Sequence, residues 1–375
     1  MPVRIDLAGG WTDTPPQACA AGGTVLNAAL LLNGQMPLLV RGRVLADPVL
    51  RFVARDLGKV WECHTLESLR DYHDPADPFA LHKAALAETG LDRPAARTLP
   101  HLLELLGGGL ELETSSEVPK GSGLGTSSIL GAAVLAVLRT LTGQPANWSV
   151  LFGAVLRLEQ RMTTGGGWQD QVGGMLPGFK ITRTRPGWEP IPEVESLTPP
   201  SGFREEFHQR MIMFYTGVPR LAKNVLQRVV TRYVDREPEV LAALHRLPLL
   251  AEQAAAAIRA GDLDALGAAV QSTWDLNPVL ELSATNPQIE KILRGVAPYC
   301  TGRKLAGAGG GGFALFLARS GEDADRARAW LAEQCPQGRA FDAAVSEQGL
   351  TVRVGDAQVL DPAEGGLHTR AGSGK

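Results

Sequence analysis

Glycine clusters place the strongest constraint on how this chain of 375 residues can fold. The chain holds 43 glycines, and many of them gather in short groups instead of spreading through linkers. Glycine loses more backbone freedom on folding than other residues, so a cluster is favourable only where side chains must be absent. We therefore expect turns with positive φ, or backbone that approaches a ligand closely. The clusters lie at residues 9–10, 107–109, 121–125, 165–167 and 307–312.

Composition excludes several classes of partner. The chain has 37 basic and 40 acidic residues, which gives a net charge of -3 and no electrostatic reason to bind nucleic acid or an anionic membrane. No apolar run reaches the roughly 18 residues of a transmembrane helix, and the N-terminus does not resemble a signal peptide. The 44% hydrophobic content is ordinary for a soluble globular protein.

Cysteine and histidine spacing predicts neither a disulfide framework nor a transition-metal site. The four cysteines show no CxxC spacing, so we expect reduced thiols in a cytoplasmic protein. The seven histidines form no metal-ligand pattern such as HExxH. The cysteines are Cys19, Cys63, Cys300 and Cys335.

Hydrophobic periodicity predicts a mixture of strands and helices. Alternation of apolar and polar positions predicts half-buried strands, and wider apolar spacing predicts helices. A proline-rich stretch at 186–202 is predicted to be a connector. We expect strands at 3–9, 109–118, 209–217, 313–318 and 350–354, and helices at 127–141, about 150–162, between about 222 and 293, and at 323–335.

The order of these elements indicates an α+β fold with two domains. The first is expected at residues 1–190 and the second at 203–360, with the glycine clusters converging where they meet. The last residues, 361–375, are expected to be a frayed tail.

The central cluster lies in "VPKGSGLGTSSIL", residues 118–130. A strand, a glycine-rich turn and a helix that begins with hydroxyl residues form a geometry that binds phosphate through backbone N–H groups. The alternative is an ordinary strand-to-helix turn with a Ser or Thr cap. A dinucleotide fingerprint is excluded because Thr126 stands where the third glycine belongs. A Walker A loop is excluded because the terminal "AGSGK" has no following Ser or Thr and no helix.

Two further stretches combine glycines with a strand, as the central cluster does. In "KLAGAGGGGFALFL", residues 304–317, four consecutive glycines precede a strand, more than a plain turn needs. In "RIDLAGGWTDTPP", residues 4–16, a strand with an arginine is followed by a turn that contains Asp13. The alternative for this stretch is a surface turn in which the Asp13 carboxylate accepts a hydrogen bond from a nearby backbone N–H.

Taken in order, "GGWTD", "PxxxGLGTSS" and "GAGGGG" resemble the three motifs of the GHMP small-molecule kinases. Within that family the sequence is most similar to the L-fucose kinases, on "RIDLAGGWTDTPP", "GSGLGTSSIL", "TTGGGWQDQVGG" and "LAGAGGGGF". The resemblance implies a ribosomal-S5-like N-terminal domain and a ferredoxin-like C-terminal domain. ATP would lie on the central loop and the sugar between the domains.

The resemblance also implies nucleotide and metal ligands. Ser127 and Glu159 would hold Mg²⁺ together with the phosphates, although Glu159 could equally be an exposed helix residue. The expected ATP contacts are Pro119, Gly121, Ser122, Gly123, Leu124, Gly125, Thr126, Ser127, Ser128, Gly309, Gly310 and Gly311.

Asp170, the lone acid of "TTGGGWQDQVGG", is the predicted catalytic base or orienting group. The preceding glycines would admit the phosphates, and the amides of Gln169 and Gln171 would hold hydrogen bonds without adding charge. Arg4 matches the cation that lies near this acid in the family, where it would favour the ionised carboxylate, unless it is a surface arginine.

The sugar site is expected around Asp13. Galactokinase-like members read "GEHTD", whereas Gly10 and Trp11 stand at the Glu and His positions here, which suits a 6-deoxyhexose. Trp11 and Trp168 could instead be core residues. Arg220 and Asn224 are weaker candidates for phosphate or sugar contact. The predicted sugar contacts are Trp11, Thr12, Asp13, Gly167, Trp168 and Gln169.

The resemblance implies ATP-dependent phosphorylation of the anomeric hydroxyl of L-fucose. One alternative is a heptose-phosphate 1-kinase, whose members tend to read "GGGTD" where this chain has Trp11. Another is a catalytically silent sugar sensor on the same fold. Fucokinase domains are often fused to a guanylyltransferase domain, so a nucleotidyltransferase is an expected fused or separate partner.

Overall fold

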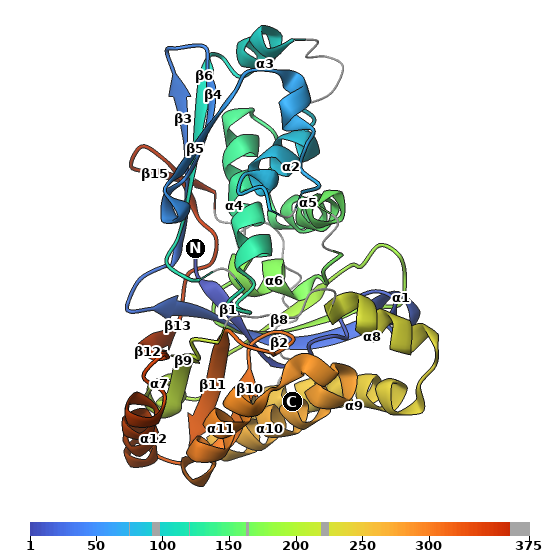
Figure 1. The fold of residues 1–375 in the computed structure, drawn as a ribbon, viewed down its shortest axis with the longest axis vertical. Helices are drawn as coiled ribbons and strands as arrows, with labels where there is room; N and C mark the ends of the chain where they lie inside the picture. The colour runs from blue at the N-terminus through green and yellow to red at the C-terminus, as the bar shows by residue number, and fades with distance from the viewer. Residues whose placement is uncertain (75, 92–97, 120, 163–164, 219–224, 361–375) are drawn as a thin grey trace, which may run out of the picture.

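The computed structural model describes residues 1–74, 76–91, 98–119, 121–162, 165–218 and 225–360. Helices and strands occur together in the upper, central and lower parts of Figure 1, which confirms the α+β class. Among the described helices, none combines the length and the apolar character needed to cross a membrane.

A central sheet lies between the two halves of the molecule. Its order is β1-β2-β7-β8, with β13 also pairing with β2. All of these pairs are antiparallel. The strands are β1 (Val3–Ala8), β2 (Gly23–Leu32), β7 (Phe179–Thr184), β8 (Glu193–Leu197) and β13 (Ala343–Val345).

A second sheet and the helices α2 to α5 form the upper part of Figure 1. The sheet order is β3-β6-β4-β5, and β4 pairs with β6 in the parallel direction. Helix α4 packs against β3 and against α2 and α5. The bounds are β3 (Leu38–Leu45), β4 (Leu50–Ala54), β5 (Lys59–Cys63), β6 (Gly109–Ser116), α2 (Ala80–Glu88), α3 (Leu99–Leu105), α4 (Thr126–Leu141) and α5 (Trp148–Arg161).

The C-terminal half builds a third sheet, in the order β10-β11-β9-β12, and several long helices. Helix α10 packs against α9 and β10, and α12 packs against α7 and α11. The bounds are α7 (Phe203–Arg210), β9 (Met211–Tyr215), α8 (Val225–Val234), α9 (Pro238–Ala260), α10 (Leu263–Leu280), α11 (Pro287–Val296), β10 (Cys300–Leu305), β11 (Phe313–Ala318), α12 (Gly321–Gln334) and β12 (Arg339–Phe341).

Strand β1 is buried along its whole length, so the expectation of a half-buried strand is wrong. Helix α9 from the C-terminal half packs against β1 and β2, and the short α6 (Gln169–Met175) packs against the same strands. Because both halves cover β1, its polar residues Arg4 and Asp6 are buried too. A buried charge is costly unless it is paired, so these two side chains need partners.

The structure differs from the prediction in the connector and in the last strand, and one strand pair joins the two predicted domains. Residues 193–197 of the predicted connector form β8, which completes the sheet beside β7 and buries Val194 and Leu197. Strand β13 of the predicted second domain pairs with β2 in the first. The predicted last strand is the first half of a hairpin, β14 (Val352–Val354) and β15 (Ala357–Leu360). The predicted tail, 361–375, lies outside the described residues.

Candidate active site

The central glycine cluster joins β6 to α4 in the predicted strand–turn–helix order. Gly121, Gly123 and Gly125 have φ of 78°, 81° and 73°, a region that favours glycine. Gly125 is the N-cap of α4, and no side chain caps the helix, so the alternative with a Ser or Thr cap is wrong. The first turn of α4 is therefore left without a capping side chain, which is the arrangement that suits an anion.

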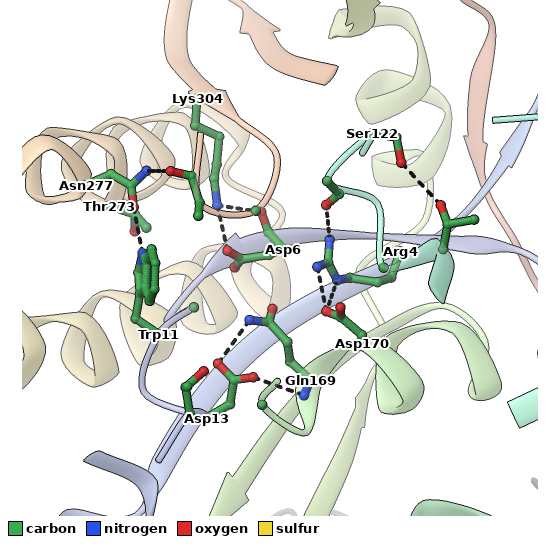
Figure 2. Close-up of a pocket in the computed structure, with 18 of the residues that line it drawn as sticks. Arg4, Asp6, Trp11, Asp13, Ser122, Gln169, Asp170, Thr273, Asn277 and Lys304 are labelled. Atoms are coloured by element: carbon green, nitrogen blue, oxygen red, sulfur yellow. Dashed lines mark hydrogen bonds and ion pairs between the residues drawn. The ribbon is translucent and has the colours of Figure 1, made fainter. Parts of the chain in front are cut away.

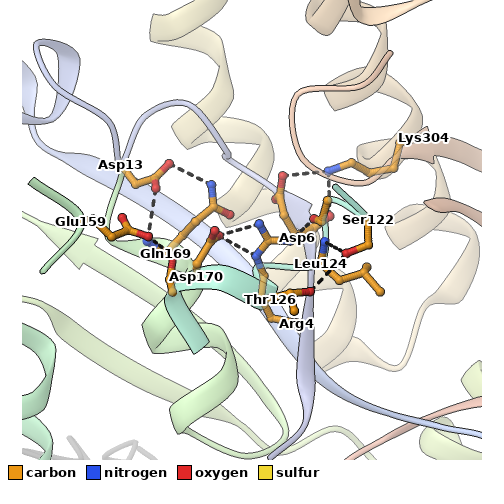
Figure 3. Close-up of polar contacts among 12 residues, drawn as sticks. Arg4, Asp6, Asp13, Ser122, Leu124, Thr126, Glu159, Gln169, Asp170 and Lys304 are labelled. Atoms are coloured by element: carbon orange, nitrogen blue, oxygen red, sulfur yellow. Dashed lines mark hydrogen bonds and ion pairs between the residues drawn. The ribbon is translucent and has the colours of Figure 1, made fainter. Parts of the chain in front are cut away.

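Arg4 connects this loop to Asp170, as Figure 3 shows. Its Nη1 donates to the carbonyl oxygen of Gly123 at 2.6 Å. Its Nε and Nη2 donate to Oδ1 of Asp170 at 2.8 and 2.5 Å. One buried guanidinium therefore fixes the distance between the glycine loop and the start of α6. The other carboxylate oxygen, Oδ2, takes no hydrogen bond from the described residues, and the Asp170 side chain is 28% exposed.

Close contacts explain why glycines stand at the positions that pack around Asp170 and Arg4. A Cβ at Gly125 would lie 3.2 Å from Cβ and Cγ of Asp170 and 3.1 Å from Cγ of Arg4. A Cβ at Gly173, on α6, would lie 2.6 Å from Cβ of Arg4. Side chains at these positions would push α6 away from the loop and from β1. The glycines thus let the Arg4–Asp170 pair form.

Asp13 lies beside the start of α6. It is 1% exposed, and it accepts hydrogen bonds from the backbone N–H of Gln169 at 3.2 Å and from its Nε2 at 3.0 Å. A Cβ at Gly167 would come within 2.0 Å of Oδ2 of Asp13, so glycine is required there. Burial, and then the nearby charge of Asp170, raise the pKa of Asp13 to about 7. Gln171, by contrast, is fully buried, and its amide has no partner among the described residues.

Trp11 connects the first motif to the third. Its Nε1 donates to Oδ1 of Asn277 on α10 at 2.7 Å, and Nδ2 of Asn277 donates to the carbonyl oxygen of Ala308 at 3.2 Å. Figure 2 shows Trp11 and Asn277 on the wall opposite Asp170. Sequence reasoning missed Asn277, because nothing in a helix with this composition marks one amide as part of a site.

These residues surround a single cavity of about 300 Å³. It extends from the glycine loop to Trp11 and is closed on the far side by α10 and the start of the third glycine cluster. The predicted residues that line it are Arg4, Trp11, Asp13, Gly121, Ser122, Gly123, Gly125, Thr126, Ser127, Gly167, Gln169 and Asp170. Sequence reasoning did not select Asp6, Thr14, Leu247, Thr273, Trp274, Asn277, Lys304, Gly307 and Ala308, which also line it.

Two predicted sugar contacts belong to the core instead. Trp168 is 1% exposed and does not line the cavity, because the chain turns there so that its ring packs inward while Gly167 and Gln169 face the cavity. The Thr12 hydroxyl donates to the carbonyl oxygen of Gly9 and accepts from the N–H of Thr24, so it holds the turn. The structure therefore brings neither side chain to the cavity.

Several predicted nucleotide contacts also lie behind the cavity wall. Leu124 is fully buried, and its carbonyl oxygen accepts from the N–H of Arg4. Cβ atoms at Gly309 and Gly310 would meet the carbonyl oxygens of Ala284 and Ser283. These glycines therefore pack against residues 282–284, and the structure does not bring them to the cavity. Gly311 and Pro119 are absent from its lining too. Arg220 and Asn224 lie outside the described residues.

Glu159 on α5 accepts a hydrogen bond from the hydroxyl of Ser128, not from that of the predicted Ser127. Burial is the main cause that raises the pKa of Glu159 to about 8. Ser127 is exposed and lines the cavity. Within the described ranges, no group of three or more His, Cys, Asp or Glu side chains could hold a metal ion alone. The donors present fit a Mg²⁺ ion that takes most of its ligands from phosphate and water.

Comparison with protein families defines the class. The model described as "GHMP kinases N terminal domain" matches residues 93–178, and "GHMP kinases C terminal" matches residues 254–337. The first match contains the glycine loop, Glu159 and Asp170, and the second contains the third glycine cluster. The chain belongs to the GHMP kinase family.

Two curated proteins are similar to most of this chain. The chain is 36% identical over 357 residues to the L-fucokinase/L-fucose-1-P guanylyltransferase of Bacteroides fragilis, covering 94% of this chain and 38% of that protein. It is 37% identical over 336 residues to the bifunctional fucokinase/GDP-fucose pyrophosphorylase of Arabidopsis thaliana, covering 89% of this chain and 31% of that protein. The chain thus spans about a third of the length of these relatives.

Solved structures share the fold. A D-glycero-D-manno-heptose 1-phosphate kinase from Bacteroides thetaiotaomicron matches with a TM-score of 0.67 at 17% identity, over 94% of this chain and 98% of that one. A galactokinase from Lactococcus lactis in complex with galactose matches with a TM-score of 0.66 at 18% identity, over 93% and 92%. At these identities the comparison shows the fold alone.

Proposed function

We propose that this chain transfers the γ-phosphoryl group of ATP to the anomeric hydroxyl of L-fucose, giving L-fucose 1-phosphate and ADP. The observation that carries the proposal is the Arg4 guanidinium, which joins the glycine loop at Gly123 to the carboxylate of Asp170 at one end of a single cavity. The identity of 36–37% to two proteins named as fucokinases supports the choice of sugar.

The glycine loop and the N-terminus of α4 would hold the phosphates of ATP. The loop offers backbone N–H groups from residues whose side chains are absent, and the helix adds a partial positive charge at Thr126. Ser127, with Glu159 behind it, would hold Mg²⁺, which neutralises phosphate charge when it is bound. Glu159 is the second proposed ligand, and in the structure its carboxylate accepts a hydrogen bond from the hydroxyl of Ser128.

Asp170 would accept the proton of the anomeric hydroxyl or orient that hydroxyl. As the new O–P bond forms and the bond to the β-phosphate oxygen breaks, the proton would pass to Asp170 and the bridging oxygen would leave with ADP. Both Arg4 bonds go to Oδ1, so Oδ2 is the oxygen available to the sugar. Arg4 would also offset charge on the transferring phosphoryl group.

The sugar would lie between Asp13, Gln169 and Trp11. Asp13 is fixed by two hydrogen bonds from Gln169, and the Trp11 ring is held by Asn277, so both are positioned before a ligand arrives. Gly10 lines the same cavity and offers no carboxylate. An aromatic wall beside a glycine suits the methyl group of a 6-deoxyhexose.

The D-glycero-alpha-D-manno-heptose 7-phosphate kinase of Campylobacter jejuni, 24% identical over 84% of this chain and 87% of its own length, supports an alternative. Purified protein with ATP and Mg²⁺ should be given L-fucose, D-galactose or D-glycero-D-manno-heptose 7-phosphate while ADP release is followed. We expect turnover with L-fucose. Turnover with the heptose phosphate alone would move the assignment to that substrate. ATP and sugar binding without ADP release would favour a regulator.

We also propose a partner. L-Fucose 1-phosphate is a sugar phosphate of the kind that a nucleotidyltransferase consumes, and both fucokinase relatives carry such an activity in their names. The product of this chain would then pass to a fused or separate nucleotidyltransferase.

A further inference from the structure

Asp6 is a third carboxylate of the cavity, beside Asp13 and Asp170, and the proposed mechanism does not use it. It follows Arg4 by two positions on β1, so the two side chains lie on the same face of the strand. It is 4% exposed and lines the cavity together with Gly10 and Gln169. In Figure 2 the Asp6 carboxylate lies between the Lys304 ammonium and the Gln169 amide.

Lys304 holds Asp6 from the other half of the molecule. Its Nζ donates to the backbone oxygen of Asp6 at 2.7 Å and to Oδ2 at 2.9 Å. Lys304 is 3% exposed, and burial lowers its pKa. A buried ion pair contributes little net stability, because removing both charges from water costs about as much as their attraction returns. The fold alone gives little reason to keep this pair.

The Asp6 carboxylate has acceptor capacity that the protein does not use. Oδ1 is buried and has no hydrogen-bond partner in the part of the chain that the structure describes. A carboxylate can accept about four hydrogen bonds, and the torsion that turns it is soft. Buried acceptors are almost always satisfied, so an unused one beside a cavity indicates that a ligand or a water supplies the donor.

Gly10 allows the Asp6 carboxylate to keep its place in the cavity wall. A Cβ at position 10 would lie 2.5 Å from Oδ2 of Asp6 and 3.4 Å from Nε2 of Gln169. Gly10 has no positive φ, so the backbone does not demand glycine there. A side chain at position 10 would therefore displace the Asp6 carboxylate from the cavity wall.

We infer that the Asp6 carboxylate, held by Lys304, accepts a hydrogen bond from a hydroxyl of the sugar and so selects substrates that carry that hydroxyl. This inference rests on the proposed function, because it takes the sugar to occupy this cavity. A site that hydrogen-bonds a hydroxyl discriminates strongly against an analogue that lacks it.

The test compares Asp6→Asn with wild type on L-fucose and on its 2-, 3- and 4-deoxy analogues, measuring KM for the sugar, KM for ATP and kcat. We expect Asp6→Asn to raise the KM for L-fucose by about tenfold or more. The KM for ATP should stay at its wild-type value. One of the deoxy analogues lacks the hydroxyl that Asp6 would bind. On that analogue, wild type and Asp6→Asn should have the same KM for the sugar.

The matched control is Asp77→Asn, because Asp77 pairs with the buried Lys83 at 2.7 Å outside the cavity. It should leave both KM values unchanged. If Asp6→Asn does not fold, the double variant Asp6→Asn/Lys304→Met removes both charges and serves in the same assays. A KM for L-fucose that matches wild type, or an equal loss on every analogue, would overturn the inference. A wild-type protein that phosphorylates no sugar would instead overturn the proposed function.

Discussion

Arg4 and Asp170 are joined through one oxygen only: Nε and Nη2 of the arginine both donate to Oδ1 of the aspartate. The third contact of the guanidinium goes to Gly123 in the glycine loop. Asp170 is thus oriented by a charge-assisted pair that leaves Oδ2 without a hydrogen bond from the described residues. A carboxylate held at one oxygen and open at the other, beside a phosphate-binding loop, suits the transfer of a phosphoryl group to a hydroxyl.

Replacing Asp170 with Asn tests this role. The amide keeps the shape of the side chain but cannot take the proton, so we expect kcat to fall on the order of 10²–10⁴ while ATP still binds. Steady-state turnover and ATP titration calorimetry measure the two effects. Asp325→Asn, an exposed acid paired with Arg328, is the control and should behave like wild type. Wild-type turnover by Asp170→Asn would remove Asp170 from the mechanism.

Gly125→Ala tests the contact between the loop and the catalytic pair. Alanine at φ 73° costs about 1–2 kcal/mol, and its Cβ would press on Asp170 and Arg4. We expect kcat to fall by about tenfold or more, because small displacements of reacting groups are costly.

Gly143→Ala is the matched control for this substitution. Its φ is 64°, and a Cβ there would have open space, so it carries the backbone cost without the contact. It should lower stability and leave kcat unchanged. Equal kcat values for the two alanine variants would show that the contact at Gly125 does not position Asp170.

The raised pKa of Asp13 predicts that the stability of the protein depends on pH. Its pKa is raised from 3.8 to about 7 in the folded protein, so between about pH 4 and 7 the folded state binds more protons than the unfolded state. The free energy of unfolding should therefore fall as pH rises through this window. The Asn side chain of Asp13→Asn cannot titrate. The free energy of unfolding of this variant should therefore not show this fall between about pH 4 and 7.

Urea unfolding of wild type and Asp13→Asn at pH 5 and pH 7.5 measures this difference. The wild type should lose stability relative to the variant at the higher pH. Parallel changes in the two proteins would contradict the assignment of a raised pKa to Asp13.

The two serines at the start of α4 should have separable roles. Ser127 is exposed at the cavity, so Ser127→Ala should raise the Mg²⁺ concentration for half-maximal rate by about tenfold with little change in stability. Ser128 is buried and donates to Glu159, so Ser128→Ala should cost about 1–3 kcal/mol of stability. An unchanged Mg²⁺ requirement in Ser127→Ala would remove Ser127 as a metal ligand.

Local sequence patterns predicted the elements that local interactions determine. The apolar runs of β9 and β11 and the periodic apolar residues of α4, α5 and α12 lie close to the expected ranges. These segments carry their own signal in a strand or helix period. Strand β8 was missed because its stability comes from pairing with β7, and prolines on both sides hide it in the sequence.

Within the site, the motifs predicted which loops meet but not how each side chain is used. The partners of Arg4 and Asp6 lie 166 and 298 positions away, so no local pattern could show that both charges are buried and paired. Trp168 and Thr12 stand next to cavity residues in sequence, yet the chain direction turns them inward. Neighbouring positions in a tight turn face different ways, and only the fold decides which side chain reaches the cavity.

The most direct measurement is a crystal structure with a non-hydrolysable ATP analogue, Mg²⁺ and L-fucose. It should place the terminal phosphates on the backbone of residues 121–127 and the anomeric oxygen about 3 Å from Oδ2 of Asp170. Phosphates bound away from this loop, or an anomeric oxygen that does not reach Asp170, would contradict the account.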